Sequence, residues 1–267
     1  MGKVLIKCIQ TPMQKYFYDR SLDSVVMVND EEYQILKTVE KTKLVPDGVL
    51  RRFVKSGLLR ETAIEEIEHP ETENLHLLAE HYMGNLILQV TQQCNLRCKY
   101  CASVLEKRKW DAQSRLLRRE LQDIELLYEQ LHSHVAEGKK THHGGPCIPA
   151  VRRLFVDTKG EFFPCERVSE EDSEMCIGSL DSGFDFDKMS FLLNHGKMIK
   201  EKCLGCWNLR MCAYCLAQIP KDNQILTENM LLQQCENSKE STLLLLYKLC
   251  ILVEFGYKGN ENLQVLK

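Results

Sequence analysis

The chain has 267 residues, enough for one large domain or two to three small ones, and its 44% apolar and 27% charged residues exclude a disordered or fibrous protein. Its net charge of −3 provides no basic field that would indicate a nucleic-acid partner. The N-terminal residues lack the apolar run of a secretory signal, and the longest apolar stretch, Leu243 to Val253, is well short of the ~20 residues that span a bilayer. We therefore expect a cytoplasmic protein that does not contact membranes.

The first predicted module comprises residues 1–80, which contain no paired cysteines. Two pieces rich in β-formers, Val4–Ile6 and Ser24–Val28, flank the polar stretch Asp19 to Asp23, as in a β-hairpin. Strand pieces of this kind, followed by the two helices described next, suit a small winged-helix-like fold. The alternative is a segment that merely packs on the main body of the protein.

Both helices of this module have recognisable end signals. Asn29 and the acids after it predict the start of a helix that continues to about Lys43. A Pro-Asp-Gly sequence at 46–48 ends that helix. A second, shorter helix over 49–56 is expected to stop at Gly57, because glycine is favoured just past a helix C-terminus.

The middle of the chain is predicted from its apolar spacing. Residues 69–84 have the composition of a linker, and the continuous apolar run Leu86 to Val90 is typical of a buried parallel strand. Leucines at helical spacing predict a helix from about Val104 to Val135. An amphipathic helix, roughly Gln233 to Glu254, is expected to end at Phe255-Gly256.

Thirteen cysteines are many for such a chain, and a reducing cytosol favours metal ligation over disulfides. Cys94, Cys98 and Cys101 follow directly on the predicted strand with three and then two residues between them. A cubane [4Fe–4S] cluster normally takes four thiolates, so three thiolates on one short loop leave one iron open to a ligand that is not protein. A structural zinc site is the alternative.

This loop, Cys94-Asn95-Leu96-Arg97-Cys98-Lys99-Tyr100-Cys101, resembles the cluster loop of radical S-adenosylmethionine (SAM) enzymes. The resemblance implies that SAM chelates the open iron of a [4Fe–4S] cluster through its amino and carboxylate groups. One electron, supplied by a reductant such as flavodoxin or ferredoxin, then cleaves SAM to a 5′-deoxyadenosyl radical. The three cysteines would bind both metal and cofactor, and no other catalytic residue can be assigned.

A second group of cysteines lies toward the C-terminus. Cys147 and Cys165 flank a predicted hairpin in which Arg153 to Asp157 pairs with Glu161 to Cys165 across a turn that needs Gly160. We expect this hairpin to bring Cys147 and Cys165 to one site. Two Cys-x2-Cys pairs and a later cysteine then follow: Cys203, Cys206, Cys212, Cys215 and Cys235.

This second pattern resembles the SPASM domain, the auxiliary-cluster extension of many radical SAM peptide-modifying enzymes. By resemblance, Cys147, Cys165 and Cys215 would hold one auxiliary [4Fe–4S] cluster, and a second would be held by Cys203, Cys206, Cys212 and Cys235. The chain has two residues rather than the family's three between Cys212 and Cys215, which leaves the division of ligands open. Cys176 is a candidate fourth ligand of the first cluster, and an open iron is the other possibility. A four-cysteine zinc knuckle is the alternative to both clusters.

The tract from His142 through Cys147 to Asp157 narrows the resemblance to the maturases of Cys-rich ribosomal peptides. In that setting, residues 1–80 resemble the element that binds the leader of a Cys-rich precursor peptide by β-augmentation. His142 and His143 either line a substrate path or are loop residues beside the cluster. Cys8 and Cys250 belong to no motif and are expected to be small buried apolar residues.

The radical SAM barrel itself is largely missing from the sequence. Only 45 residues separate Cys101 from Cys147, whereas one βαβ unit takes about 30 residues and a full barrel roughly 250. The Gly-Gly-Glu tract that binds the SAM amino group in the family is absent, and a large internal deletion near Ser103 to Arg108 would explain the gap. Without the barrel, the strand at 86–90 is expected to have no neighbours that bury it.

The resulting prediction is an α+β protein with three parts. These are a winged-helix-like leader-binding module at 1–80, a remnant of the partial (β/α) barrel at 81–140, and a SPASM domain with a β-hairpin and helices at 141–267. By resemblance, the protein would be an enzyme that modifies a Cys-rich peptide by radical chemistry, for example by thioether formation. The alternative is a catalytically inactive iron–sulfur or zinc protein that only binds the peptide.

Overall fold

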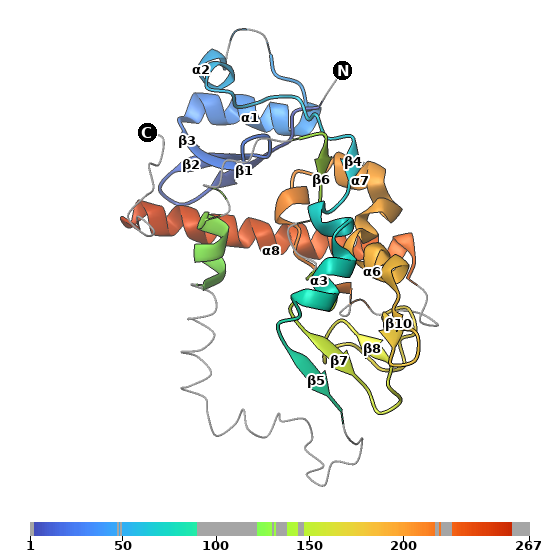
Figure 1. Cartoon of the computed structure of the whole chain (residues 1–267). Helices are drawn as coiled ribbons and strands as arrows, with labels where there is room; N and C mark the ends of the chain where they lie inside the picture. Colours follow the sequence, from blue (N-terminus) through green and yellow to red (C-terminus); the bar gives the residue numbers. More distant parts are fainter. Residues whose placement is uncertain are drawn as a thin grey trace. The chain divides into compact units, whose positions relative to one another are not determined.

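The structure is a computed structural model, and it describes residues 3–46, 48, 50–89, 122–129, 131, 138–143, 147–216, 219 and 226–257. The described residues form two compact units (Figure 1). The first contains residues 3–63, the segment 122–131 and residues 240–257, and the second contains residues 64–89 and 139–239. The predicted domains at 1–80, 81–140 and 141–267 stay a prediction.

The first unit is built on a three-stranded antiparallel sheet of order β1-β2-β3, formed by β1 (Ile6–Gln10), β2 (Lys15–Asp19) and β3 (Ser24–Val28). The sequence analysis missed β2, although its Lys-Tyr-Phe-Tyr-Asp sequence is rich in aromatic β-formers. It also assigned the first strand to residues 4–6 instead of 6–10. The central strand β2 pairs with both neighbours, and Phe17 lies opposite Cys8 on one side and Val26 on the other.

The polar stretch between β2 and β3 forms a turn, but the predicted hairpin had the wrong partner, because β3 pairs with β2 and not with the first strand. The Asp19 carboxylate accepts hydrogen bonds from the backbone N–H groups of Ser21 and Leu22, and its second oxygen accepts one from Leu59 at 2.6 Å. Burial raises the pKa of Asp19, an effect that these hydrogen bonds oppose. Asp23 adopts a positive φ of 48°, and the Tyr18 hydroxyl donates to its carboxylate. The turn is therefore held by side chains buried beneath it.

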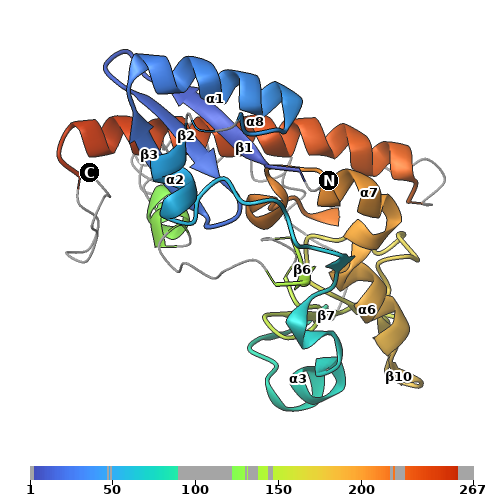
Figure 2. The same ribbon diagram turned by 90° about the horizontal axis from the view of Figure 1, so that it is seen from above.

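Helix α1 (Asp30–Thr42) packs along one face of this sheet in both views (Figure 1, Figure 2). It begins as predicted at Asn29, whose side chain accepts from the Glu32 N–H while the Glu32 carboxylate accepts from the Asn29 N–H. This reciprocal capping box satisfies two backbone donors that would otherwise lack partners. Leu36 and Val39 lie fully buried on the face of α1 that meets the sheet.

A second short helix, α2 (Arg51–Lys55), follows within the predicted range 49–56. Gly57 has φ of +88° just past its end, which confirms the predicted C-terminal signal. The Phe53 ring of α2 packs edge-on against Phe17 of the sheet at a centroid distance of 5.3 Å. Helices α1 and α2 thus cover the same face, to which Phe17 contributes its ring.

The opposite face of the sheet is covered by the end of the last helix, α8 (Glu228–Glu254). Successive strand side chains alternate between faces, so Tyr16 points away from Phe17. Its hydroxyl donates to Glu254 at 3.0 Å, and the Thr11 hydroxyl donates to the same carboxylate oxygen. Cys8 and Cys250 are both buried, as predicted. The sheet is therefore packed on both faces.

The described part of the predicted helix over 104–135 is helical from 122 to 129. Its buried side chains are Ile124, Leu127 and Tyr128, with Leu131 just beyond. They recur at the spacing from which the helix was predicted. Tyr128 contacts Tyr257 edge-on at a centroid distance of 5.6 Å. The rest of the predicted helix lies outside the described residues.

The second unit contains the predicted hairpin, in which β7 (Leu154–Val156) pairs antiparallel with β8 (Phe162–Phe163). Gly160 has φ of +82°, and the Asp157 carboxylate accepts from the N–H groups of Lys159 and Glu161 across the turn. β5 (Leu86–Leu88) joins β7 in parallel at the other edge. The parallel direction of this strand was predicted correctly.

The prediction of a buried strand was wrong, because the exposed fractions of Leu86 and Leu88 in β5 are 50% and 61%. The expectation that no neighbour buries the strand is confirmed for these two side chains, although β5 does pair with β7. β5 is the edge of a three-stranded sheet, so only the partly buried Ile87 packs against the core. The continuous apolar run predicted a strand buried on both faces, but a sheet this small leaves one face of β5 exposed.

The prediction of a linker at 69–84 was also wrong, because most of this segment is helical. A 3₁₀ turn, η1 (Pro70–Thr72), is followed by helix α3 (Leu75–His81), whose Leu75 and Ala79 are buried one turn apart. The polar residues that indicated a linker lie on the exposed side. Leu75 and Ala79 join the apolar core of the second unit, which anchors the segment.

The remaining elements of the second unit are short. Two strands far apart in sequence, β4 (Glu66–Ile67) and β6 (Lys140–Thr141), pair in parallel. The small hairpin β9 (Gly178–Ser179) and β10 (Gly183–Phe184) leads into α6 (Phe186–Leu193), η2 (His195–Ile199), α7 (Lys200–Leu204) and η3 (Leu209–Met211).

The predicted α+β class is confirmed at the level of mixed small sheets and helices. Within the described residues no sheet closes into a barrel. The search of these residues for a helix long and apolar enough to cross a membrane found none.

We predict that Asn29→Ala lowers the free energy of unfolding by about 1 kcal/mol, because the first turn of α1 loses its cap. Asn29→Ser is the matched control, since serine caps helices about as well as asparagine does. Urea unfolding followed by circular dichroism measures both variants. Equal losses in the two variants would show that the cap contributes nothing.

Candidate metal centre

Cys94, Cys98 and Cys101, the predicted cluster loop, lie outside the described residues. The described chain on their N-terminal side ends after β5 at Gln89, whose side-chain amide donates to Glu170 at 2.8 Å. The ligand assignment at the three cysteines therefore stays a prediction.

Four of the C-terminal cysteines interact electrostatically with one another in the second unit. Cys203 lies in α7, Cys206 and Cys212 lie on either side of η3, and Cys235 lies in α8. Burial and, to a smaller extent, the neighbouring sulfurs of Cys235, Cys206 and Cys212 together raise the pKa of Cys203 to about 12. These four are the residues that the resemblance assigned to one cluster, and we call them the cysteine group.

The turns between the cysteines follow directly from their close spacing. The Cys206 N–H donates to the Cys203 carbonyl at 3.0 Å, and the Leu209 N–H donates to the Cys206 carbonyl at 3.4 Å. The Cys212 N–H then donates to the Leu209 carbonyl at 3.3 Å. Each bond spans three residues and folds the chain back on itself, so this sequence of turns keeps Cys203, Cys206 and Cys212 in one region.

Cys212 also accepts a hydrogen bond from outside these turns. The Ser238 hydroxyl donates to its sulfur at 3.2 Å, and the Asn208 side-chain amide donates to the Ser238 oxygen at 3.0 Å. Burial raises the pKa of Cys212 to about 11, and the Ser238 bond partly opposes this rise. The helix that contributes Cys235 thus also supplies a donor to Cys212.

A buried imidazole completes the surroundings of Cys203. His143 Nε2 lies 3.4 Å from the Cys203 sulfur, and the ring stacks on His195 at a centroid distance of 5.0 Å and an interplanar angle of 15°. Tyr214 contacts both rings edge-on. Burial lowers the pKa of His143 to about 3 and also lowers that of His195, so both rings are neutral at physiological pH.

The position of His143 depends on the short parallel β4–β6 pairing just before it, which we call the ladder. β6 ends at Thr141, and the next ring, His142, lies against His69 at a centroid distance of 4.3 Å. His143 then enters the core beside Gly196, where an added Cβ would lie 1.8 Å from the imidazole. Only glycine leaves room for the ring at this contact.

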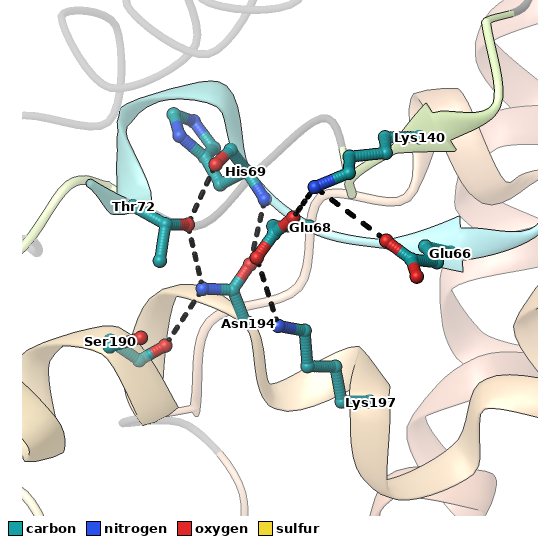
Figure 3. Close-up of polar contacts among 8 residues, drawn as sticks. All are labelled: Glu66, Glu68, His69, Thr72, Lys140, Ser190, Asn194 and Lys197. Atoms are coloured by element: carbon teal, nitrogen blue, oxygen red, sulfur yellow. Dashed lines mark hydrogen bonds and ion pairs between the residues drawn. The ribbon is translucent and has the colours of Figure 1, made fainter. Parts of the chain in front are cut away.

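The ladder is held by a polar cluster that Figure 3 shows in full. Asn194, which is buried, accepts from the His69 N–H at 2.7 Å and donates to the Thr72 hydroxyl and the Ser190 carbonyl. Glu68 lies between Lys140 and Lys197, whose hydrogen bonds and charges lower its pKa. The cluster ties β4 and β6 to the end of α6.

We predict that Asn194→Ala lowers the free energy of unfolding by about 1–3 kcal/mol, because it leaves the partly buried His69 N–H without its acceptor. Lys197→Ala is the control from the same cluster. It removes only an exposed ion pair with Glu68, which is worth about 0–1 kcal/mol. Urea unfolding of both variants measures the difference. A loss for Lys197→Ala as large as that for Asn194→Ala would contradict this ranking.

The other predicted auxiliary ligands are less tightly grouped. Cys165 interacts electrostatically with Cys215, as the resemblance implied for one site. Cys147 is exposed, and no interaction among the described residues links it to Cys165. The sulfur of Cys176, the candidate fourth ligand, donates to the Gly178 carbonyl at 3.4 Å. The first auxiliary site therefore stays a prediction.

No protein-family model, curated protein or solved structure matches this chain. The assignment of a function therefore depends on the residues themselves.

The donor set of the cysteine group fits an iron–sulfur cluster. Four sulfurs share one region, and one buried polar group near them, the Tyr214 hydroxyl, has no hydrogen-bond partner among the described residues. Cluster sulfides and thiolates accept hydrogen bonds from such a donor. Among the described residues, no three His, Cys, Asp or Glu side chains converge on the position of a single ion. A cluster of four irons is wider than one ion, so its ligands are more widely spaced.

The sequence analysis found the cysteines but not the buried rings around them. It predicted that His142 and His143 either line a substrate path or lie beside the cluster, and His143 is indeed beside Cys203. It missed His195, Tyr214 and Asn208 entirely. These residues lie within a few positions of Asn194, Cys212 and Cys206, and this closeness in sequence was the one sign that they could belong to the site. Closeness in sequence does not indicate which side chains point inward.

Proposed function

We propose that this chain is an iron–sulfur protein of the radical SAM type whose C-terminal part binds auxiliary clusters in the manner of a SPASM domain. The observation that supports this most strongly is the cysteine group. Cys203, Cys206, Cys212 and Cys235 influence one another's ionisation across two turns and a helix. The resemblance to the SPASM domain assigns these same four residues to one cluster.

The chemistry proposed for the protein is radical modification of a Cys-rich precursor peptide. A [4Fe–4S] cluster at Cys94, Cys98 and Cys101, when bound together with SAM, supplies the 5′-deoxyadenosyl radical that abstracts hydrogen. The contribution of the chain's own C-terminal residues is to hold auxiliary clusters away from water. Cys203 and Cys212 are both buried, which supports that role.

The first unit supports the proposed binding of a precursor leader. β3 pairs with β2 on one side, and the described residues provide no strand on its other side. An open strand edge of this kind can bind an extended peptide by β-augmentation. Met27 of β3 is 43% exposed and would lie beside such a peptide. The strands and the helices α1 and α2 are compatible with a winged-helix-like module.

A second candidate function is peptide binding without catalysis, by an iron–sulfur or zinc protein. It is favoured by the shortness of the segment between Cys101 and Cys147 and by the exposed leucines of β5, Leu86 and Leu88. In a complete barrel, parallel strands are covered by helices on their outer face. The two candidates differ in whether SAM is cleaved.

We predict that anaerobic reconstitution with iron and sulfide produces a brown protein, and that Cys212→Ala removes the iron of one cluster. Cys250→Ala is the matched control, because Cys250 is also buried but has no other cysteine beside it among the described residues and should leave iron content unchanged. Iron, sulfide and zinc analyses with visible spectra measure the result. A colourless protein with stoichiometric zinc would exclude the cluster.

We further predict that the reduced, reconstituted protein releases 5′-deoxyadenosine from SAM, and that Cys98→Ala abolishes the release because the open iron is lost. Chromatographic measurement of 5′-deoxyadenosine is the test, with Cys250→Ala as the control that retains activity. A protein that holds its clusters but releases no 5′-deoxyadenosine supports the second candidate function instead.

A further inference from the structure

The Cys203 sulfur contacts the imidazole of His143, with Nε2 at 3.4 Å. The distance is within the range of a hydrogen bond to sulfur. Both residues are buried, with exposed fractions of 3% for His143 and 4% for Cys203. Water therefore does not compete with the contact.

Three other contacts hold the imidazole in this orientation. Its face stacks on His195, its edge lies against Tyr214, and its Cε1 side lies against Gly196 with no space for a further carbon. His195 is itself oriented by a contact of 2.9 Å between its Nδ1 and the Leu192 carbonyl. The ring cannot swing away from the sulfur without disturbing this packing.

The chemistry of the two groups determines the direction of the hydrogen bond once a cluster is bound. A thiolate ligand has no proton and can only accept, so the imidazole must donate from Nε2. Donors to cluster sulfurs stabilise the reduced state, which carries one more negative charge, and so raise the reduction potential.

We propose that His143 is a positioning residue that donates a hydrogen bond to Cys203 and raises the reduction potential of the cluster held by the cysteine group. The proposal depends on the proposed function, because it requires that cluster. It assigns to His143 the tuning of electron transfer rather than ligation of iron or contact with substrate.

The test is an anaerobic redox titration of the reconstituted full-length chain, followed by electron paramagnetic resonance. The signal of this cluster is the one that disappears in Cys212→Ala. In His143→Phe, which keeps an aromatic ring but lacks the donor, the potential should fall by about 59 mV, a tenfold change in the ratio of oxidised to reduced cluster. In His143→Gln, whose amide can still donate, much of the potential should be retained.

Two further variants separate hydrogen bonding from packing. Gly196→Ala keeps the histidine but forces it off its position, so the potential should fall as in His143→Phe. His142→Phe changes the adjacent ring, which contacts His69 and the backbone carbonyl of His143 but not the His143 ring, and should leave the potential unchanged. Iron content is measured in every variant.

Each outcome has one interpretation. Equal potentials in wild type, His143→Phe and Gly196→Ala, with full iron content, overturn this inference and leave the proposed function intact. Loss of this cluster's iron from all of the His143 and Gly196 variants would make His143 a ligand or a structural residue and also overturn it. Failure of the wild-type chain to assemble any cluster rejects the proposed function itself.

Discussion

The burial of several cysteine sulfurs in one region is the constraint on which the second unit depends. Removing thiols from water and setting them beside one another disfavours their ionisation, and the pKa of Cys203 and Cys212 rises to about 12 and 11. Metal binding reverses this preference because a cation stabilises the thiolate outright. Without metal the group is a set of neutral thiols, whereas with metal it becomes a charged centre.

The surrounding residues can stabilise the negative charge of the thiolates by hydrogen bonding and not by opposite charge alone. Ser238 donates to Cys212 and is itself oriented by Asn208, while His143 contacts Cys203. These donors come from α8, from the turn between the cysteines and from the chain after β6. A cluster in this position would therefore be surrounded by donors from three separate segments, as the outer shells of metal sites generally are.

The same unit shows why so short a ladder as β4–β6 matters. Two residue pairs contribute little by themselves, but they align segments more than 70 residues apart in sequence. Asn194 then ties the chain just after β4 to the end of α6 through partly buried hydrogen bonds, and the next residue but one is the glycine against which His143 packs. The polar cluster and the cysteine group are thus connected through residues 194–196.

Features with local causes could be predicted from the residues alone. The capping box at Asn29, the glycine turns at Gly57 and Gly160, and the spacing of the cysteines all depend on residues within a few positions of one another. Burial was decided only by tertiary structure, because it depends on how many neighbours an element finds. The apolar run at β5 is exposed on a sheet edge, and the polar segment after His69 is helical because Leu75 and Ala79 reach the core. The contact of His143 with Cys203 spans 60 residues and required the ladder, the glycine and the stacked ring together, which no local pattern encodes.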